Sequence, residues 1–259
     1  VFFYSVILYF VFIVFGTEKW NPKQFFYALQ PVSKNQWWFF TNYILLYFLA
    51  PFLNYGMEKI PKKQILIMLI AFLYFDCYTG IIHKSIGQNG YTLFHFITLY
   101  LCARYVSIYL MFERDAEIRH RFQKFIFFLR RNSLGFYIAA SLLVFLSAYF
   151  VSLISASREV WRVFSYNNPI LILSSVFLFF TFYNLKIHKK WINWLAMGVL
   201  GVYLIHDHPL VEIQLAAFIQ WMKVSIVSPW MFVVGISLTV LAVFLIGSLV
   251  DIGRKKVFE

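Results

Sequence analysis

The sequence predicts an all-α protein, a polytopic transmembrane helical bundle, and three observations lead to this fold class. Of 259 residues, 61% are hydrophobic and only 13% are charged, whereas soluble domains are about half apolar and about a quarter charged. Phe alone occurs 32 times, more often than a soluble core of this size could bury. The chain also contains about eight apolar runs of membrane-spanning length, and only helices satisfy the backbone of such isolated runs within lipid.

The eight runs follow one another along the whole chain without a repeat or a low-complexity tract. They cover Val1–Gly16, Trp37–Tyr55, Gln64–Ile82, Tyr91–Phe112, Leu134–Ser155, Pro169–Leu185, Trp191–His206 and Trp230–Asp251. Tryptophan begins the second, seventh and eighth runs, which is the placement expected of a side chain that prefers the membrane interface. We therefore predict a single membrane-embedded domain over residues 1–259.

The distribution of basic residues predicts the orientation of these helices. Lys and Arg number 15 after the second, fourth, sixth and eighth runs, but only 7 in the loops on the other side. Because basic loops stay in the cytoplasm, both ends of the chain are predicted to be cytoplasmic, with Ser157–Asn168 and Val211–Pro229 outside. The net charge of +12 is then a signal of membrane topology and does not call for a nucleic-acid partner.

Two segments outside the runs are predicted to be amphipathic helices. Arg114–Arg131 alternates apolar and basic residues at helical spacing, which is typical of a helix that lies on the membrane surface. An alternative use of its charges is to attract the phosphates of coenzyme A. Val211–Lys223 is a second candidate for an interfacial helix, on the outer side.

The segment Gly201–Leu210, GVYLIHDHPL, ends an apolar run with three ionisable residues. His206, Asp207 and His208 are expensive to place at the end of such a run, so they indicate a functional site unless they lie in hydrated headgroups. We place His206 at the outer end of the seventh run. We expect no metal here, because residues two apart on a helix do not face one another and no third ligand is nearby.

Arg104 is a charged residue within the fourth run, where insertion costs at least ~2.5 kcal/mol. It is predicted either to pair with Asp76 of the third run or to bind an anionic acyl donor. His95 also lies in the fourth run, but nine residues correspond to ~13 Å along a helix. We therefore do not expect His95 and Arg104 to form one site.

Three segments together resemble acyltransferase family 3, membrane proteins that O-acylate cell-surface sugars. The Val-Tyr-Leu-Ile-His and Pro-Leu of Gly201–Leu210 are similar to that family's penultimate span. In Trp37–Asn54, Leu-Tyr before Pro-Phe-Leu-Asn is similar to an early-middle span. Gly90-Tyr91 followed by LYLCARYVSIY is similar to the span after the next loop. The order and intervals of these segments carry the resemblance.

The resemblance implies an integral membrane O-acyltransferase, with about ten spans in the whole family fold, in the plasma membrane of a bacterium. Its donor would be acyl-CoA, with acetyl-CoA first, and its acceptor a hydroxyl of an exopolysaccharide or another cell-surface glycan; no bound cofactor is implied. The candidate residues are His206 for catalysis and Arg104, Asp207 and His208 for substrate binding.

The chain also departs from the family pattern. The family's catalytic histidine lies in a first span that has no counterpart here, and its paired-arginine motif has no secure match. We therefore expect an N-terminally truncated fragment whose main catalytic base is missing and which is inactive alone.

Two other functions remain open for a basic, aromatic-rich membrane protein. A polysaccharide polymerase or flippase would be expected to carry a long outer loop with several arginines. A secondary transporter would be expected to show repeated spans or paired broken helices, and the prolines of this chain do not form such a pair.

Overall fold

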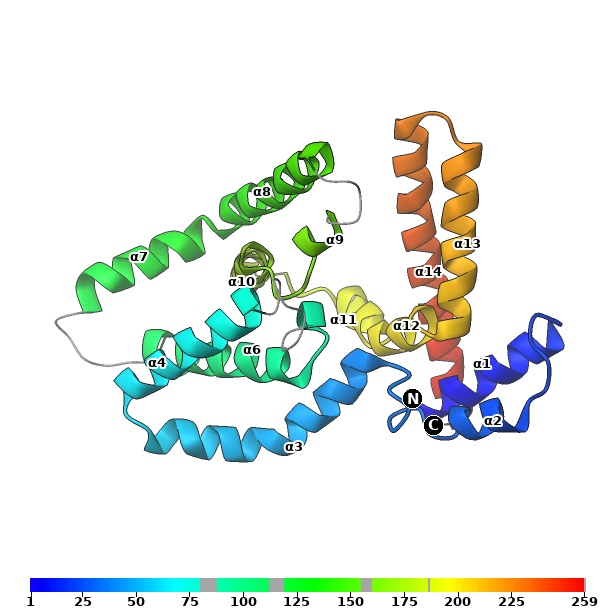
Figure 1. Cartoon of the computed structure of the whole chain (residues 1–259), viewed down its shortest axis with the longest axis horizontal. Coiled ribbons are helices and arrows are strands. Elements are labelled where there is room, and N and C mark those ends of the chain that lie inside the picture. The colour runs from blue at the N-terminus through cyan, green and yellow to red at the C-terminus, as the bar shows by residue number, and fades with distance from the viewer. Residues whose placement is uncertain (80–87, 112–118, 155–159, 186, 259) are drawn as a thin grey trace. The chain divides into compact units, whose positions relative to one another are not determined.

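The computed structural model describes residues 1–79, 88–111, 119–154, 160–185 and 187–258, and every regular element in these ranges is a helix (Figure 1). The predicted all-α class is therefore confirmed. The single membrane-embedded domain over residues 1–259 stays a prediction, and within the chain the structure distinguishes two compact units. Unit 1 comprises Val1–Thr41 and Ile187–Glu259, and unit 2 comprises Asn42–Lys186.

Each of the eight apolar runs contains helix. Five correspond to one helix each: α1 (Phe2–Val14), α3 (Trp38–Lys59), α8 (Ser133–Ile154), α10 (Pro169–Asn184) and α14 (Pro229–Phe258). The other three contain two helical segments each: α4 (Lys62–Leu73) with the π-helix η1 (Tyr74–Thr79), α6 (Leu93–Tyr105) with the π-helix η3 (Val106–Met111), and α11 (Lys190–Ala196) with α12 (Val199–His206). The predicted run ends at Ile82, Phe112 and Ser155 lie outside the described residues.

Two helices are long and apolar enough to cross a membrane by themselves. They are Ser133–Ile154 and Pro229–Val257, and three further apolar helices, among them α1 and α10, are shorter. A bilayer core of about 30 Å needs roughly 20 helical residues. The number of membrane crossings, predicted as eight, therefore stays a prediction.

Unit 2 contains two helix pairs joined by polar and apolar contacts. In the first pair, α8 lies antiparallel to α10, with the Ser133 hydroxyl 3.1 Å from that of Thr181 and Ser141 near Ser174. In the second, α4 packs on α6 around a buried core. That core consists of Met57, Ile65, Leu69, Leu101 and Tyr105.

The predicted surface helix of unit 2 is present as α7 (Arg119–Arg131), and residues 114–118 lie outside the described residues. Its last turn contacts α10, because the Arg130 guanidinium lies 4.9 Å from the Tyr183 ring centre. Phe125, Phe127 and Phe128 are exposed beside Lys124 and Arg131. This mixture of exposed aromatic and basic side chains is consistent with a helix at a membrane interface.

In unit 1, α12 packs closely on the C-terminal half of α14 through small residues. A Cβ added to Gly198 would lie 3.4 Å from Ser248, and one added to Gly247 would lie 3.1 Å from Val202. Helix α13 (Pro209–Ser225) lies alongside α14 in Figure 1, and Met222 faces Gly235. The segment predicted as an interfacial helix on the outer side is therefore packed against an apolar helix.

The core of unit 1 joins three distant parts of the sequence. Tyr4 of α1, Trp37 before α3 and Leu204 of α12 form one buried cluster. Three short helices complete the described chain: α2 (Pro22–Ala28) in unit 1, and η2 (Gln88–Gly90) and α9 (Val160–Val163) in unit 2.

Candidate functional site

A buried carboxylate in unit 2 lies in a π-helix. Asp76 belongs to η1 and has no exposed surface. A π-helical turn is rare and occurs frequently at functional sites. The main-chain carbonyl of Asp76 accepts a hydrogen bond from the Asn167 side-chain amide at 2.7 Å. Asn167 is also fully buried, so this contact fixes the π-helix to the loop that precedes α10.

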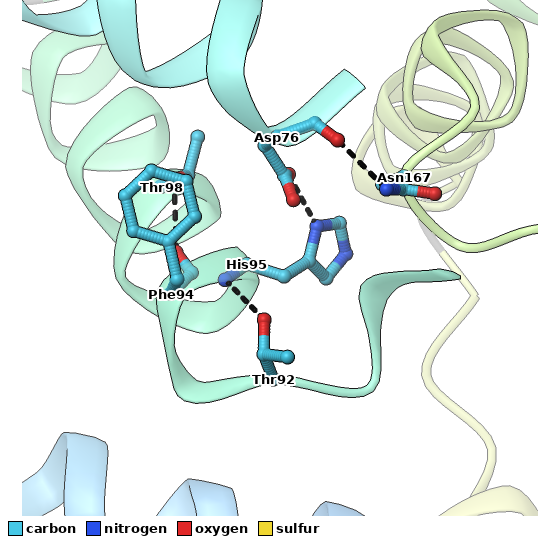
Figure 2. A network of polar contacts seen from close by, with 6 residues as sticks. All are labelled: Asp76, Thr92, Phe94, His95, Thr98 and Asn167. Carbon is cyan, nitrogen blue, oxygen red and sulfur yellow. Dashed lines mark hydrogen bonds and ion pairs between the residues drawn. The ribbon is translucent and has the colours of Figure 1, made fainter. Parts of the chain in front are cut away.

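The side chain of Asp76 points to a histidine on the next helix. The distance between Asp76 Oδ2 and His95 Nδ1 is 2.6 Å, and only 4% of His95 is exposed (Figure 2). Thr92 is the N-cap of α6, and its hydroxyl accepts a hydrogen bond from the His95 backbone N–H. The cap therefore sets the start of the helix that presents the imidazole to the carboxylate.

The loop that carries Asn167 is fixed by two local features. Gly90 has φ = +88°, and a Cβ there would lie 2.5 Å from Tyr166 Cβ, so glycine permits this close approach. The Tyr166 N–H donates to the Asn89 carbonyl at 2.9 Å. Asn168 then caps α10 through its side chain. Three segments thus converge on the Asp76–His95 pair: η1, the start of α6, and residues 165–168.

Asp76 and Asn167 retain unused hydrogen-bonding capacity. Asp76 Oδ1 and Asn167 Oδ1 are buried and have no hydrogen-bond partner within the part of the chain that the structure describes. Unpaired buried acceptors are costly and therefore uncommon in proteins. Together with the carboxylate–imidazole pair, they mark this region as chemically unusual for an apolar helical unit.

Arg104 does not pair with Asp76, so that prediction is wrong. Its guanidinium instead lies 3.7 Å from Glu58, and both side chains are partly exposed. The reason is the helical spacing: His95 is the residue of α6 that faces Asp76, and Arg104 lies more than two turns further along. Its predicted role in binding an acyl donor stays a prediction.

His206 in unit 1 has a defined tautomer. Its Nδ1 lies 2.9 Å from the Val202 carbonyl oxygen, one turn back in α12. A carbonyl only accepts, so Nδ1 donates and the lone pair of the neutral ring is on Nε2. The ring is half-buried and contacts Tyr203 edge-on, at 6.0 Å between centres. His206 could therefore accept a proton or a hydrogen bond at Nε2.

His208 has the opposite arrangement. It is the N-cap of α13, and its Nδ1 accepts a hydrogen bond from the Leu210 N–H. Only 4% of its surface is exposed, and its ring contacts Trp37 edge-on. Burial lowers the pKa of His208 to about 4, so the ring is neutral near pH 7. Asp207, between the two histidines, is the C-cap of α12.

The predicted outer position of His206 stays a prediction, and the structure shows what its helix packs on. A Cβ added to Gly201 would lie 2.5 Å from Asp251, and Asp251 ends the eighth run, at its predicted cytoplasmic side. His206 follows Gly201 by five residues, or ~7.5 Å of helix. The seventh run is two short helices separated at Met197–Gly198.

The predicted and observed sites differ in their residues. His206, Asp207 and His208 lie together in unit 1, whereas Arg104 lies in unit 2. The sequence interpretation considered Asp76 and His95 only in relation to Arg104 and therefore missed their pairing. The usable signal was that two ionisable residues lie near the facing ends of consecutive apolar runs. No group of three potential metal ligands occurs among the described residues.

Comparison with known proteins identifies the family. The family model described as an acyltransferase domain, that of acyltransferase family 3, matches residues 1–248. No curated protein and no solved structure matches the chain. The matched range includes Asp76, His95, Arg104 and the segment from His206 to His208. Because the match covers nearly the whole sequence, the chain belongs to acyltransferase family 3 and is an acyltransferase of the membrane kind.

Proposed function

We propose that this protein transfers an acyl group from acyl-CoA to a hydroxyl of an exopolysaccharide or another cell-surface glycan. Acetyl is the acyl group that we propose first. Family membership supports the acyl transfer, and the apolar composition supports a location in the membrane. The donor, the acyl group and the acceptor come from the resemblance that the sequence carries.

The observation that carries a catalytic role is the geometry of His206. Its Nδ1–H is held by the Val202 carbonyl at 2.9 Å, so Nε2 can act as a hydrogen-bond acceptor or a base. Half-burial keeps the ring partly desolvated while leaving it accessible. His206 is therefore our candidate for a residue that assists the transfer. Asp207 and His208 follow His206 in the sequence and would also contact the substrate.

We assign the residues that would bind the acyl donor from their positive charge. Acyl-CoA carries phosphates, and the predicted cytoplasmic loops hold most of the basic residues. Arg104 is the candidate within the fourth run, because its Glu58 partner is exposed and the 3.7 Å pair is loose. The exposed basic side chains of α7 could add long-range electrostatic attraction for the same phosphates.

The test uses the full-length protein in a strain that lacks its own copy, with the O-acyl content of surface polysaccharide as the measurement. His206→Ala should reduce acylation by ~10²-fold or more, the usual effect of a positioned acid or base. His208→Asn is measured beside it, because it removes a neighbouring imidazole but keeps a capping side chain. Its loss of acylation should be smaller than that of His206→Ala. Wild-type acylation by His206→Ala at matched protein level would exclude His206 from the reaction.

A polymerase, flippase or transporter is a different class of function. Such a protein would change the amount or length of surface polysaccharide when deleted. An O-acyltransferase would leave the polymer in place and remove only its alkali-labile acyl groups. The same deletion strain therefore distinguishes these functions.

A further inference from the structure

We infer that the exposed face of α7 binds the phosphate groups of anionic phospholipids. This basic–aromatic face consists of Lys124, Phe127, Phe128 and Arg131. The four residues are spaced i, i+3, i+4 and i+7, so they lie on one side of the helix. The inference concerns how the protein contacts its membrane, and it does not depend on the proposed acyl transfer.

The side chains of the basic–aromatic face are uncovered. Phe127 is 66% exposed and Phe128 is 52% exposed, and Lys124 and Arg131 are exposed beside them. Removal of apolar surface from water is favourable, so two neighbouring uncovered rings indicate an apolar environment on this side of α7. The flanking positive charges indicate that this environment also offers anionic groups.

The other side of α7 is held against unit 2, which fixes the direction of the face. The Arg130 guanidinium lies 4.9 Å from the Tyr183 ring centre, and the Arg130 carbonyl accepts a hydrogen bond from the Asn184 side chain at 2.7 Å. Ile126 and Leu129 are partly buried. The helix therefore cannot turn about its axis to bury its two phenylalanines without losing these contacts.

The face lies close to the predicted cytoplasmic end of α8. Asn132 connects the two helices and keeps the helical hydrogen bonding, because its N–H donates to the Phe128 carbonyl and its carbonyl accepts from the Phe136 N–H, both at 3.1 Å. Phe128 is five residues before Ser133, the first residue of α8, or ~7.5 Å along the helix. The headgroup region is roughly 5–8 Å thick on each side of the hydrocarbon core. With α8 across the membrane, as its length and composition allow, the face lies at the level of the headgroups.

The charge of α7 indicates which headgroups it binds. Five of its thirteen residues are Lys or Arg and none is Asp or Glu. Basic clusters beside a membrane-spanning helix attract lipids with a net negative headgroup. The long stems of Lys124 and Arg131 allow their charges to reach the phosphates while the two phenyl rings enter the boundary between headgroups and acyl chains.

Coenzyme A also carries phosphates, but a lipid fits the face better. The acyl chains of a lipid cover both phenyl rings, whereas free coenzyme A brings a single adenine ring. We therefore assign the direct contacts of the basic–aromatic face to an anionic phospholipid such as phosphatidylglycerol.

The experiment uses the full-length protein in nanodiscs that contain equal amounts of phosphatidylglycerol and phosphatidylcholine with identical acyl chains. Phe127→p-benzoylphenylalanine places a photo-crosslinker in the face and keeps an aromatic side chain. After irradiation, mass spectrometry of the peptide with residue 127 gives the ratio of the two attached lipids. Lys124→Gln with Arg131→Gln removes the charges of the face. Lys63→Gln with Lys189→Gln is the matched control, because both lysines are exposed and belong to other predicted cytoplasmic loops.

We expect phosphatidylglycerol to exceed phosphatidylcholine at residue 127. Removing the charges of Lys124 and Arg131 should lower the ratio by about 30-fold, which corresponds to about 1 kcal/mol for each basic residue. Phosphatidylcholine should still be attached in that variant, because the aromatic side chain stays at the membrane, and this product shows that the protein is inserted. The control variant should keep the wild-type ratio. NaCl at ~1 M should lower the ratio, because the Debye length is then ~3 Å.

Four results would overturn the inference. Equal attachment of the two lipids with the charges intact would exclude selection by the headgroup. An equal decrease in the control variant would indicate an effect of the net charge of the protein. Absence of any lipid at residue 127 would place the face outside the membrane. Attachment of coenzyme A in place of lipid, when coenzyme A is added at saturating concentration, would show that the face binds the donor.

Discussion

Replacing Gly201 with Ala tests how unit 1 is packed. The added Cβ would lie 2.5 Å from both Cβ and Cγ of Asp251 and 2.7 Å from its Oδ1, whereas favourable carbon contacts lie near 3.5–4.0 Å. Asp251 cannot move aside freely. It is 2% exposed and is held by the hydroxyl of Tyr4, by Arg254 Nε at 2.9 Å and by Lys255 Nζ at 3.2 Å.

The magnitude follows from two opposing effects. Overpacking a well-filled site costs about 1–3 kcal/mol, and displacing Asp251 weakens hydrogen bonds to charged groups that are worth ~1.5–3 kcal/mol each. Against this, Ala is better than Gly in a helix by roughly 0.5–1 kcal/mol. We expect a net loss of ~2 kcal/mol in the free energy of unfolding, which combines these ranges.

Gly253→Ala is the matched control, because an added Cβ at Gly253 has no atom within 4 Å. Its free energy of unfolding should rise by ~0.5–1 kcal/mol, because only the higher helix propensity of alanine acts there. The two variants are compared by equilibrium unfolding of the purified protein in mixed detergent micelles. If Gly201→Ala is as stable as Gly253→Ala, α12 does not pack on Asp251.

Three further predictions concern pH, charge and topology. The folded state of His208 has a pKa of about 4, below its ordinary value of 6.5. Between these values the unfolded chain binds the proton and the folded chain does not, so stability falls as pH drops from 6.5 to 4. The loss is at most ~3 kcal/mol, and His208→Asn should flatten this part of the stability–pH curve. Arg104→Ala should cost less than ~1 kcal/mol of stability, because the ion pair of Arg104 with Glu58 is exposed. A higher KM for acyl-CoA at unchanged kcat would show that Arg104 binds the acyl donor. An unchanged KM would exclude that role. In a variant without native cysteines, Cys at Lys256 should react with an impermeant reagent only after permeabilisation, whereas Cys at Phe164 should react in intact cells. The reverse pattern would contradict the orientation predicted from the basic residues.

The sequence predicted the helices well because apolar length and periodicity are local properties. Each apolar run contains helix, and the basic surface helix is present as α7. The three runs that consist of two segments could not be recognised from hydrophobicity, because a π-turn or a break between short helices leaves the composition unchanged. Gly198, at the break in the seventh run, is the local signal that was available.

The candidate site was predicted less well because it depends on contacts between distant segments. Asp76 and His95 are separated by 19 residues and Asn167 by 91 from Asp76, and no local pattern shows which charged residues face one another. Charge alone favoured Arg104 as the partner of Asp76. The helical phase of α6 decides otherwise, because it turns His95 toward Asp76 and leaves Arg104 beside Glu58.

The contacts within each unit can be compared with the membrane depths that the sequence predicts for the residues they join. In unit 2 the contact between Ser133 and Thr181 joins residues at the predicted cytoplasmic ends of their runs. In unit 1, Tyr4 from the predicted cytoplasmic end of its run shares a core with Trp37 and Leu204, which were predicted at the outer side. Helix α1 has 13 residues, or ~20 Å, which is shorter than the bilayer core of about 30 Å. The crossings predicted for the first and seventh runs therefore stay predictions. The orientation of unit 1 then depends on α14, the one helix in its described part that is long and apolar enough to span a membrane.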